Sequence, residues 1–255
     1  MKKCKLIVAD LDGTLLRNDK SISRFTIETL MACRNRGILV GFATARPIRG
    51  VAEIRELFEP DILINHNGAV FAHGDLQDSL GINGEQLCGL LEKILSDFPN
   101  AEIGVEADDV LYANYDVTKH WPGWSHTWTA FAEPQFEYAD KILVSLHNVD
   151  VEVLKSYLPE ECYLEVADGV MGMVMSKRAT KFKSIVSVCD ALGISPSDVI
   201  CFGDDNNDIS MIEGCGVGVA MENAHVMVKE AADVVCLSNE NDGVARWILD
   251  NLLSD

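Results

Sequence analysis

An apolar stretch that ends in two aspartates is the feature that most restricts the fold of this chain. The stretch Leu6–Ala9 leads directly into Asp10, Asp12, Gly13 and Thr14. A short, continuous apolar run of this kind predicts a buried strand in a parallel sheet. Ligands of open α/β sheets bind beyond the carboxyl ends of the strands. The run therefore predicts an α/β fold with a polar site at the end of this strand.

The two aspartates also predict a cation. Asp10 and Asp12 are two residues apart, so in an extended chain their side chains point the same way. Two carboxylates held together repel each other unless a cation or a shared proton relieves the repulsion. Hard divalent cations prefer oxygen ligands. We expect a metal ion here, with one carboxylate acting as a nucleophile and the other as an acid or base.

Length and composition are those of an ordinary globular protein. The chain has 255 residues, of which 48% are hydrophobic and 24% are charged, enough for one core or a core with an inserted domain. Its apolar runs are shorter than the roughly 18 residues that cross a bilayer, and the run after Lys5 ends too early for a signal peptide. Eight scattered cysteines without a Cys-x-x-Cys pair predict reduced thiols and a cytoplasmic location.

The charge of the chain limits its partners. The formal net charge is −19, which disfavours nucleic acid and anionic membranes because the field repels phosphate backbones. An anionic substrate would need positive charge close to its binding site. The sequence does not indicate an oligomeric state.

Strands and helices alternate at both ends of the chain. The predicted strands there are residues 6–11, 38–43, 61–64, 199–203, 217–220 and 234–237. The predicted helices are residues 23–36, 47–58, 179–192, 205–213, 224–232 and 243–253. Between them, residues 84–176 alternate more strongly, with predicted strands 101–107, 110–115, 141–147 and 163–175 and helices 85–98 and 151–158. This middle part predicts an α+β domain inserted into a parallel α/β domain.

Two further strand or helix ends carry groups that suit a phosphate. Thr44 follows the second predicted strand, and its hydroxyl could bind phosphate oxygens or simply cap the next helix. Lys181 begins a predicted helix, where it could bind a phosphate or remain a solvated charge. Lys177 and Lys183 are local competitors for the phosphate role.

A second oxygen-rich cluster follows the strand at 199–203. Residues 203–208 read Gly-Asp-Asp-Asn-Asn-Asp, which could be a metal site, a capped helix start or a calcium loop. The calcium loop is rejected because Ile209 and Cys215 stand where that loop needs glycine and glutamate.

These four pieces, in this order, resemble the haloacid dehalogenase superfamily. The run Asp-Leu-Asp-Gly-Thr-Leu at 10–15, then Thr44, Lys181 and the run at 203–208 match its motifs over the whole chain. The closest resemblance is to the Cof-like phosphatases. It implies a Rossmann-like parallel core of residues 1–82 and 178–255, and an inserted C2-type α+β cap of residues 83–177.

The resemblance also implies a mechanism. Asp10 would attack phosphorus and form an aspartyl-phosphate, while Asp12 would act first as the acid and then as the base. The residues implied for Mg²⁺ are Asp10, Asp12 through its backbone carbonyl, Asp204 and Asp208. The residues implied for the phosphate are Thr44, Lys181 and Asn67, although Asn67 could belong to a simple turn.

Three positions depart from the family pattern. Ala45 stands in the usual Thr-Gly-Arg, Asp205 stands in the usual Gly-Asp-Gly, and Phe182 follows the lysine where glycine is common. None of these changes removes a catalytic group. Asp205 adds negative charge that could either tune the metal site or face water.

The inserted part is expected to select the substrate. Its segment 116–131 is rich in tryptophan and histidine, which could bind a sugar or pack inside the cap. The candidate substrate contacts are Arg46, Asn207, His120 and Trp121.

The sequence thus predicts a Mg²⁺-dependent phosphatase of small phosphorylated metabolites, such as sugar phosphates. A phosphomutase and a non-catalytic binding or regulatory protein of the same fold are the alternatives. A mutase needs a second phosphate site, usually with arginine, and this chain has no arginine between Arg55 and Arg178.

Overall fold

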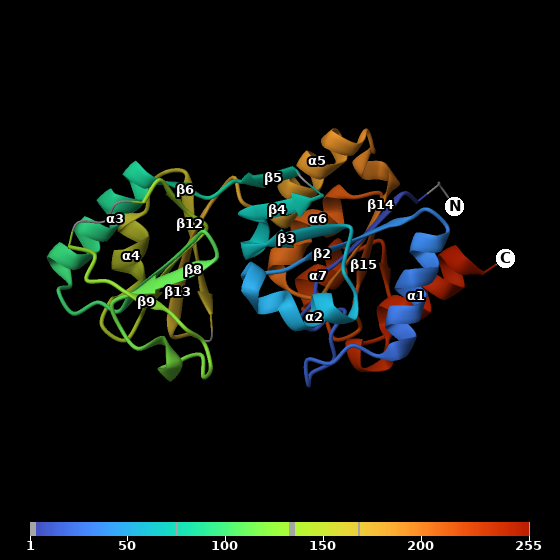
Figure 1. Ribbon diagram of the computed structural model, residues 1–255, viewed down its shortest axis with the longest axis horizontal. Helices are drawn as coiled ribbons and strands as arrows, with labels where there is room; N and C mark the ends of the chain where they lie inside the picture. Colours follow the sequence, from blue (N-terminus) through green and yellow to red (C-terminus); the bar gives the residue numbers. More distant parts are fainter. Residues whose placement is uncertain (1–3, 75, 133–135, 168, 255) are drawn as a thin grey trace. The chain divides into compact units, whose positions relative to one another are not determined.

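The chain forms two compact units. The computed structural model describes residues 4–74, 76–132, 136–167 and 169–254 (Figure 1). One unit combines Met1–Asp78 with Thr180–Asp255, and the other is the intervening Ser79–Ala179. From the sequence we placed the corresponding boundaries at residues 83 and 177.

The first unit contains an eight-stranded sheet of order β16-β15-β14-β1-β2-β3-β4-β5. The strands from β16 to β3 are parallel, and β4 is antiparallel to β3. Their bounds are β1 Leu6–Ala9, β2 Leu39–Ala43, β3 Ile62–Asn65, β4 Val70–His73, β5 Leu76–Ser79, β14 Val199–Gly203, β15 Val217–Ala220 and β16 Val234–Val235. Every residue of β1 and β14 is buried, as expected for the centre of a parallel sheet.

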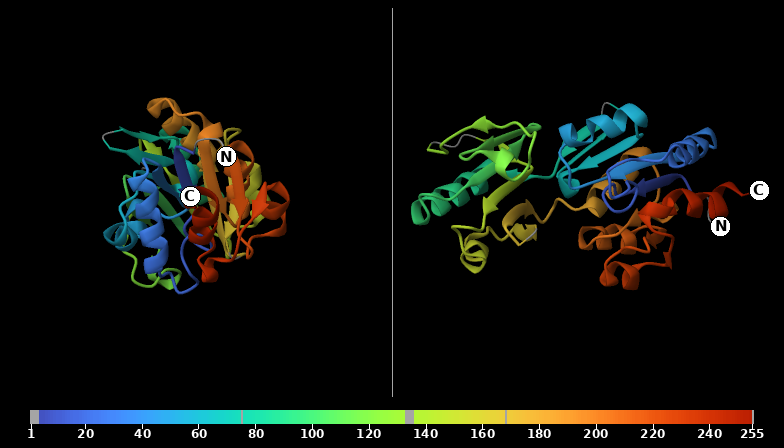
Figure 2. Two further views of the ribbon diagram at one scale, coloured as in Figure 1. Left: turned by 90° about the vertical axis from the view of Figure 1, so that its right-hand side faces the viewer. Right: turned by 90° about the horizontal axis from the view of Figure 1, so that it is seen from below.

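The helices of this unit begin and end at residues that the sequence marks. They are α1 Arg24–Asn35, α2 Ala52–Leu57, α5 Lys181–Leu192, α6 Ile209–Gly214, α7 Val226–Ala231 and α8 Gly243–Ile248. Ser23 caps α1 by accepting a hydrogen bond from the Thr26 amide, and Thr180 caps α5 in the same way through the Lys183 amide. Helix α1 packs beside α8, and α5 packs beside α6 (Figure 2).

The second unit combines helices and strands in an α+β arrangement. Its six-stranded sheet has the order β12-β13-β11-β7-β8-β9, and β6 pairs with β10 in a second, two-stranded sheet. The bounds are β6 Ile82–Asn83, α3 Gly84–Asp97, β7 Ile103–Ala107, β8 Val110–Ala113, β9 Thr127–Trp128, β10 Tyr138–Ala139, β11 Lys141–Ser145, α4 Val151–Tyr157, β12 Cys162–Ala167 and β13 Met171–Ser176. Leu87 and Leu91 of α3 and Leu154 of α4 share one buried cluster with Val105 and Val144 of the sheet.

Several predicted elements are wrong in detail. The single strand predicted at 163–175 is a hairpin of β12 and β13 that reverses near Gly169, whose φ is +70°. The predicted helix at 47–58 is a 3₁₀ turn, Ile48–Val51, followed by the short α2. Strands β4 and β5, which extend the sheet beyond β3, were not predicted from the sequence.

Two general properties follow from the described part of the chain. It contains no helix of the length and apolar character that crossing a bilayer requires. All eight cysteines carry free thiols.

Candidate active site

The register of the parallel strands brings the polar residues to one edge of the sheet. Ala9 of β1 pairs with Phe42 of β2 on one side and with Phe202 of β14 on the other. The residues that directly follow these three strands therefore lie at the same edge of the sheet. Asp10 and Asp204 follow two of the central strands directly, as predicted.

Lys181 joins two of the carboxylates. Its Nζ lies 2.6 Å from Oδ1 of Asp10 and 2.6 Å from Oδ1 of Asp208. The lysine is 1% exposed. Burial acts to lower its pKa, but the two carboxylates outweigh burial and raise the pKa above the ordinary value. Lys181 is therefore a fixed cation at the first turn of α5.

Asp208 orients the loop after β14. Its Oδ2 accepts hydrogen bonds from the backbone amides of Asp204 at 2.9 Å and Asp205 at 3.1 Å. Its Oδ1 accepts from Lys181. Because both oxygens are engaged and the residue is fully buried, Asp208 holds the loop and the lysine in a fixed relation.

The turn after β1 contacts the same loop. The Thr14 hydroxyl donates a 2.6 Å hydrogen bond to Oδ1 of Asp204. Gly13 has a φ of +80°, and a Cβ at this position would clash with the Asp204 carboxylate. Glycine is therefore required between Asp12 and Thr14, both by the backbone conformation and by the close approach of Asp204.

Three carboxylates form a site that could hold a cation. One oxygen from each of Asp10, Asp204 and Asp208 lies within 4.8 Å of the others. With Lys181 as their partner, these groups carry a formal charge of −2. Burial raises the pKa of Asp204 to about 6, although the hydrogen bond from Thr14 opposes the rise. Burial also raises the pKa of Asp10, against the effect of Lys181. Excess negative charge on the buried Asp10 and Asp208 and the half-buried Asp204 favours binding of a hard cation.

Asp12 is held by two cations rather than by the carboxylate cluster. Arg46 donates to Oδ2 through Nε at 2.6 Å and to Oδ1 through Nη2 at 2.7 Å. The Lys20 ammonium lies 2.7 Å from the same Oδ1. Burial acts to raise the pKa of Asp12, but the hydrogen bonds from Arg46 and Lys20 outweigh it and lower the pKa. The predicted acid is therefore an ionised carboxylate in this state.

The remaining core residues lie at the ends of β2 and β3. Thr44 is 1% exposed, and its backbone carbonyl accepts a hydrogen bond from the Asn67 amide at 3.0 Å. The Thr44 hydroxyl accepts from the Arg46 amide at 3.1 Å. Asn67 has a φ of +57°, and its Oδ1 accepts from Nδ2 of Asn207 at 2.9 Å. This last bond links the end of β3 to the loop that carries Asp204 and Asp208.

The other two predicted residues belong to the second unit. The Nε2 of His120 lies 4.0 Å from Oε2 of Glu102, and the imidazole ring packs near the rings of Tyr115 and Trp121. Trp121 packs against a second, smaller apolar cluster of that unit, which includes Leu111 and Val117, and its ring centroid lies 6.0 Å from that of Trp124. These contacts agree with the alternative that His120 and Trp121 pack inside the second unit. A role of either residue in substrate binding stays a prediction.

The sequence analysis missed two contacts of this site. Lys20 was not singled out because a lone lysine in a polar turn gives no distinctive signal. Thr14 was noted only as part of the turn, although a hydroxyl directly after Asp-Gly could have been matched with the second acidic cluster.

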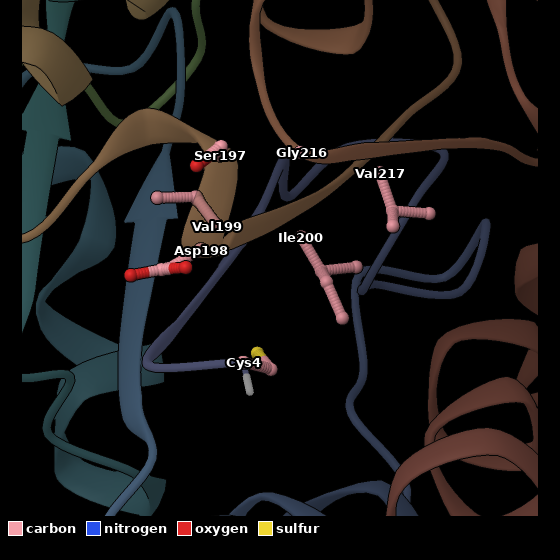
Figure 3. Close-up of a pocket in the computed structure, with 7 residues that line it drawn as sticks. All are labelled: Cys4, Ser197, Asp198, Val199, Ile200, Gly216 and Val217. Carbon is pink, nitrogen blue, oxygen red and sulfur yellow. The ribbon is translucent and has the colours of Figure 1, made fainter. Parts of the chain in front are cut away.

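A cavity of about 170 Å³ lies at the opposite edge of the sheet (Figure 3). It opens beside Cys4 and the first residues of β14 and β15. Its carboxylate, Asp198, pairs with Lys5 at 2.9 Å. Burial raises the pKa of the Cys4 thiol to about 11. The cavity thus lacks an activated group and contains none of the predicted site residues.

Sequence comparisons find relatives over almost the whole chain. A family model of haloacid dehalogenase-like hydrolases matches residues 7–248. A 5-amino-6-(5-phospho-D-ribitylamino)uracil phosphatase of Bacillus subtilis is 31% identical over 263 residues, which cover 95% of this chain and 96% of the relative. A phosphoglycolate phosphatase of Methanopyrus kandleri is 28% identical over 248 residues, which cover 95% of each chain.

Solved structures share the fold. A protein from Thermotoga maritima superposes with a TM-score of 0.87 at 23% identity, covering 99% of this chain and 98% of that chain. A subclass IIB sugar phosphatase of the same superfamily superposes with a TM-score of 0.83 at 23% identity, covering 96% and 98% of the two chains. These similarities confirm the predicted parallel α/β core with an inserted α+β domain.

Proposed function

Because this chain belongs to the haloacid dehalogenase-like hydrolases, we propose that it is a phosphatase acting on small phosphorylated metabolites through an aspartyl-phosphate. The observation that carries the proposal is the buried pair of Asp10 and Lys181 at the end of the central strand. One Asp10 oxygen is held by the lysine, which orients the other for attack. A bond forms from this oxygen to phosphorus as the bond from phosphorus to the leaving oxygen breaks.

Asp12 would move the protons. It would donate one to the leaving alcohol and later accept one from the water that hydrolyses the aspartyl-phosphate. Arg46 and Lys20 keep Asp12 ionised here, so the acid role requires a rise of its pKa. A phosphate dianion close to Asp12 supplies that rise because a like charge disfavours the ionised carboxylate.

The phosphoryl group would be held by neighbouring donors. Lys181 provides a fixed positive charge, and the Thr44 hydroxyl lies at the adjacent strand end. We assign Asn67 and Asn207 to the same set of phosphate-binding residues, since their side chains are already hydrogen-bonded to each other. These donors would stabilise the charge that develops on the equatorial oxygens.

The carboxylate cluster fits Mg²⁺. Its donors are carboxylate oxygens of two buried residues and one half-buried residue with an excess of negative charge, which suits a hard cation. We propose Asp10, Asp204 and the backbone carbonyl of Asp12 as ligands. Asp208 would support them, because its oxygens already bind Lys181 and two backbone amides. A bound Mg²⁺ would offset the repulsion between Asp10 and the incoming phosphate.

The substrate class is supported by the relatives. Two of them are named as phosphatases of a ribitylamino-uracil phosphate and of phosphoglycolate, both small phosphate monoesters. We expect the second unit to act as a cap that selects among such molecules. A panel of sugar phosphates, together with these two compounds, would rank them by kcat/KM.

Substitution of Asp10 tests the mechanism. We expect Asp10→Asn to abolish release of phosphate from p-nitrophenyl phosphate while leaving the melting temperature within a few degrees of the wild type. Asp190→Asn, on the exposed face of α5, is the matched control and should retain full activity. Chelation with EDTA should stop the wild-type reaction, and added Mg²⁺ should restore it. Undiminished turnover by Asp10→Asn would exclude Asp10 as the nucleophile.

A hexose 1-phosphate distinguishes the phosphatase from a phosphomutase of this fold. The phosphatase releases inorganic phosphate, whereas a mutase produces an isomeric hexose phosphate. Formation of the isomer without release of phosphate would overturn the proposal.

A further inference from the structure

The turn that carries Asp12 is held by two asparagines from the far end of the chain. Asn223 Nδ2 donates a 2.7 Å hydrogen bond to the backbone carbonyl of Gly13. Asn239 Nδ2 donates to the backbone carbonyl of Leu16 at 3.0 Å. Both carbonyls belong to the turn that follows the proposed acid, and the backbone of Asp12 forms a β-bridge with that of Leu16.

The two asparagines are also joined to each other. The backbone amide of Asn239 donates to Oδ1 of Asn223 at 3.0 Å. Asn239 is 3% exposed, and its Nδ2 also reaches Oδ1 of Asn18 at 3.1 Å. The Nδ2 of Asn223 thus binds the turn, while the Oδ1 of the same side chain binds Asn239. The pair forms one continuous hydrogen-bonded bridge from the C-terminal part of the chain to the turn.

The fold explains why these residues meet. Asn223 follows β15, two strands away from β1 across β14, and Asn239 begins the 3₁₀ turn Asn239–Asn241 after β16. All four strands are parallel, so their carboxyl ends share one edge of the sheet. Polar side chains in the loops after the outer strands can therefore reach the turn after the central strand.

We propose that Asn223 and Asn239 are positioning residues that fix Asp12 for proton transfer to the leaving group. The inference rests on the proposed phosphatase function. Asp12 sits next to Gly13, which packs closely against the Asp204 carboxylate, so a displacement of the turn changes where the Asp12 carboxylate lies relative to Asp204. When the carbonyls of Gly13 and Leu16 lose their donors, the turn is free to move the Asp12 carboxylate away from the leaving oxygen.

A purely structural role predicts a different result. The ion pair between Arg17 and Asp242 ties the same turn to the same C-terminal loop, with a distance of 3.0 Å. The turn also closes on itself through the bond from the Arg17 amide to the Ser21 carbonyl. These contacts remain when the asparagines are replaced, so the turn stays attached. What changes is the placement of Asp12.

The test compares two leaving groups. A p-nitrophenolate departs without help from an acid, whereas the alkoxide from an alkyl phosphate needs a proton, a contribution of about 10²- to 10⁴-fold in general. We expect Asn223→Ala and Asn239→Ala each to lower kcat/KM for glycerol phosphate by about 10-fold or more. For p-nitrophenyl phosphate the fall in kcat/KM should stay under about 3-fold, because kcat/KM covers the steps up to departure of the leaving group and omits the later hydrolysis of the aspartyl-phosphate.

Matched variants complete the design. Asn241→Ala is the control, because Asn241 lies in the same loop, is exposed and donates a 2.9 Å hydrogen bond from its Nδ2 to the Ser238 hydroxyl rather than to the turn. It should leave both rates unchanged. The double variant Asn223→Ala/Asn239→Ala should resemble the more impaired single variant, since the two residues form one bridge. Asn223 is exposed, so its replacement remains informative even where Asn239→Ala fails to fold.

Three outcomes are decisive. A selective loss of alkyl phosphate turnover in a folded variant supports the inference. Equal losses for both substrates, or no loss for either, overturn it while the phosphatase function stands. If the wild type releases phosphate from neither substrate, the proposed function fails and the inference fails with it.

Discussion

Lys181 shows how a single residue serves chemistry rather than stability. Its ammonium lies between Asp10 and Asp208 with 1% of the residue exposed. Buried ion pairs of this kind contribute little net stability, because desolvating the charges offsets their attraction. Well-packed apolar side chains in place of all three groups would serve the fold equally well, whereas removal of the lysine alone would leave two buried carboxylates unpaired. What an apolar residue cannot supply is a fixed positive charge next to Asp10, the proposed nucleophile.

Asp140, directly before β11, is a buried carboxyl that the proposed mechanism does not use. Burial raises its pKa to about 7, and the nearby Glu106 and Asp108 add to the rise. The native state therefore keeps a proton that the unfolded chain releases near pH 4. The free energy of unfolding should fall as the pH rises from about 4 to about 7, and should level off above that range.

Asp140→Asn tests this pH dependence. The amide cannot ionise, so the variant should lose less stability than the wild type between pH 5 and pH 8. Urea unfolding followed by tryptophan fluorescence is the measurement, because three of the four tryptophans, Trp121, Trp124 and Trp128, lie in the second unit. The exposed Glu92→Gln on α3 is the control. Parallel pH curves for wild type and Asp140→Asn would contradict the expectation.

At the scale of elements, α5 depends on one close contact with the turn after β3. Gly68 has a φ of +100°, and a Cβ there would clash with the carbonyl of Thr180 and lie 2.9 Å from the Ser184 hydroxyl. The Gly68 carbonyl in turn accepts a 2.8 Å hydrogen bond from Ser184. Thr180 caps the helix that begins with Lys181, so this contact sets the position of the lysine.

Alanine substitutions separate backbone strain from the clash. Gly37 also has a positive φ of +75°, but no atom lies within 4 Å of a Cβ built there. Gly37→Ala should cost about 1 kcal/mol of stability and leave activity unchanged. Gly68→Ala should cost at least about 2 kcal/mol and lower kcat, because it displaces the start of α5. Thermal unfolding and p-nitrophenyl phosphate assays measure both effects. Equal costs with full activity in both variants would argue against the contact.

The sequence was sufficient for the parallel core because its signals are local. Buried runs ending in Asp10, Thr44 and Asp204 predict strands whose carboxyl ends meet, and the register confirms that Asp10 and Asp204 follow adjacent strands. The hairpin of β12 and β13 was predicted wrongly because apolar alternation continues through the reversal and hides it. The contact of Lys20 with Asp12 could not be predicted, since it depends on the path of an irregular turn.

The charge of the whole molecule bears on how an anionic substrate reaches the site. The net charge of −19 repels a phosphate dianion, while Arg46, Lys20 and Lys181 attract it locally. Salt separates the two effects, because the Debye length is about 10 Å at 0.1 M and distant charges are screened more strongly than contacts.

Added salt should therefore weaken the long-range repulsion more than the local attraction. We expect KM for a dianionic phosphate monoester to fall as KCl increases from about 10 mM to about 150 mM at saturating Mg²⁺, a range over which the Debye length shrinks from about 30 Å to about 8 Å. The value of kcat should change little, since Asp10 and Lys181 are buried. Lys20→Met, which removes one local cation, should raise KM at every salt concentration and keep the same downward trend. A KM that rises with salt in the wild type would mean that the local cations, not the net charge, control binding.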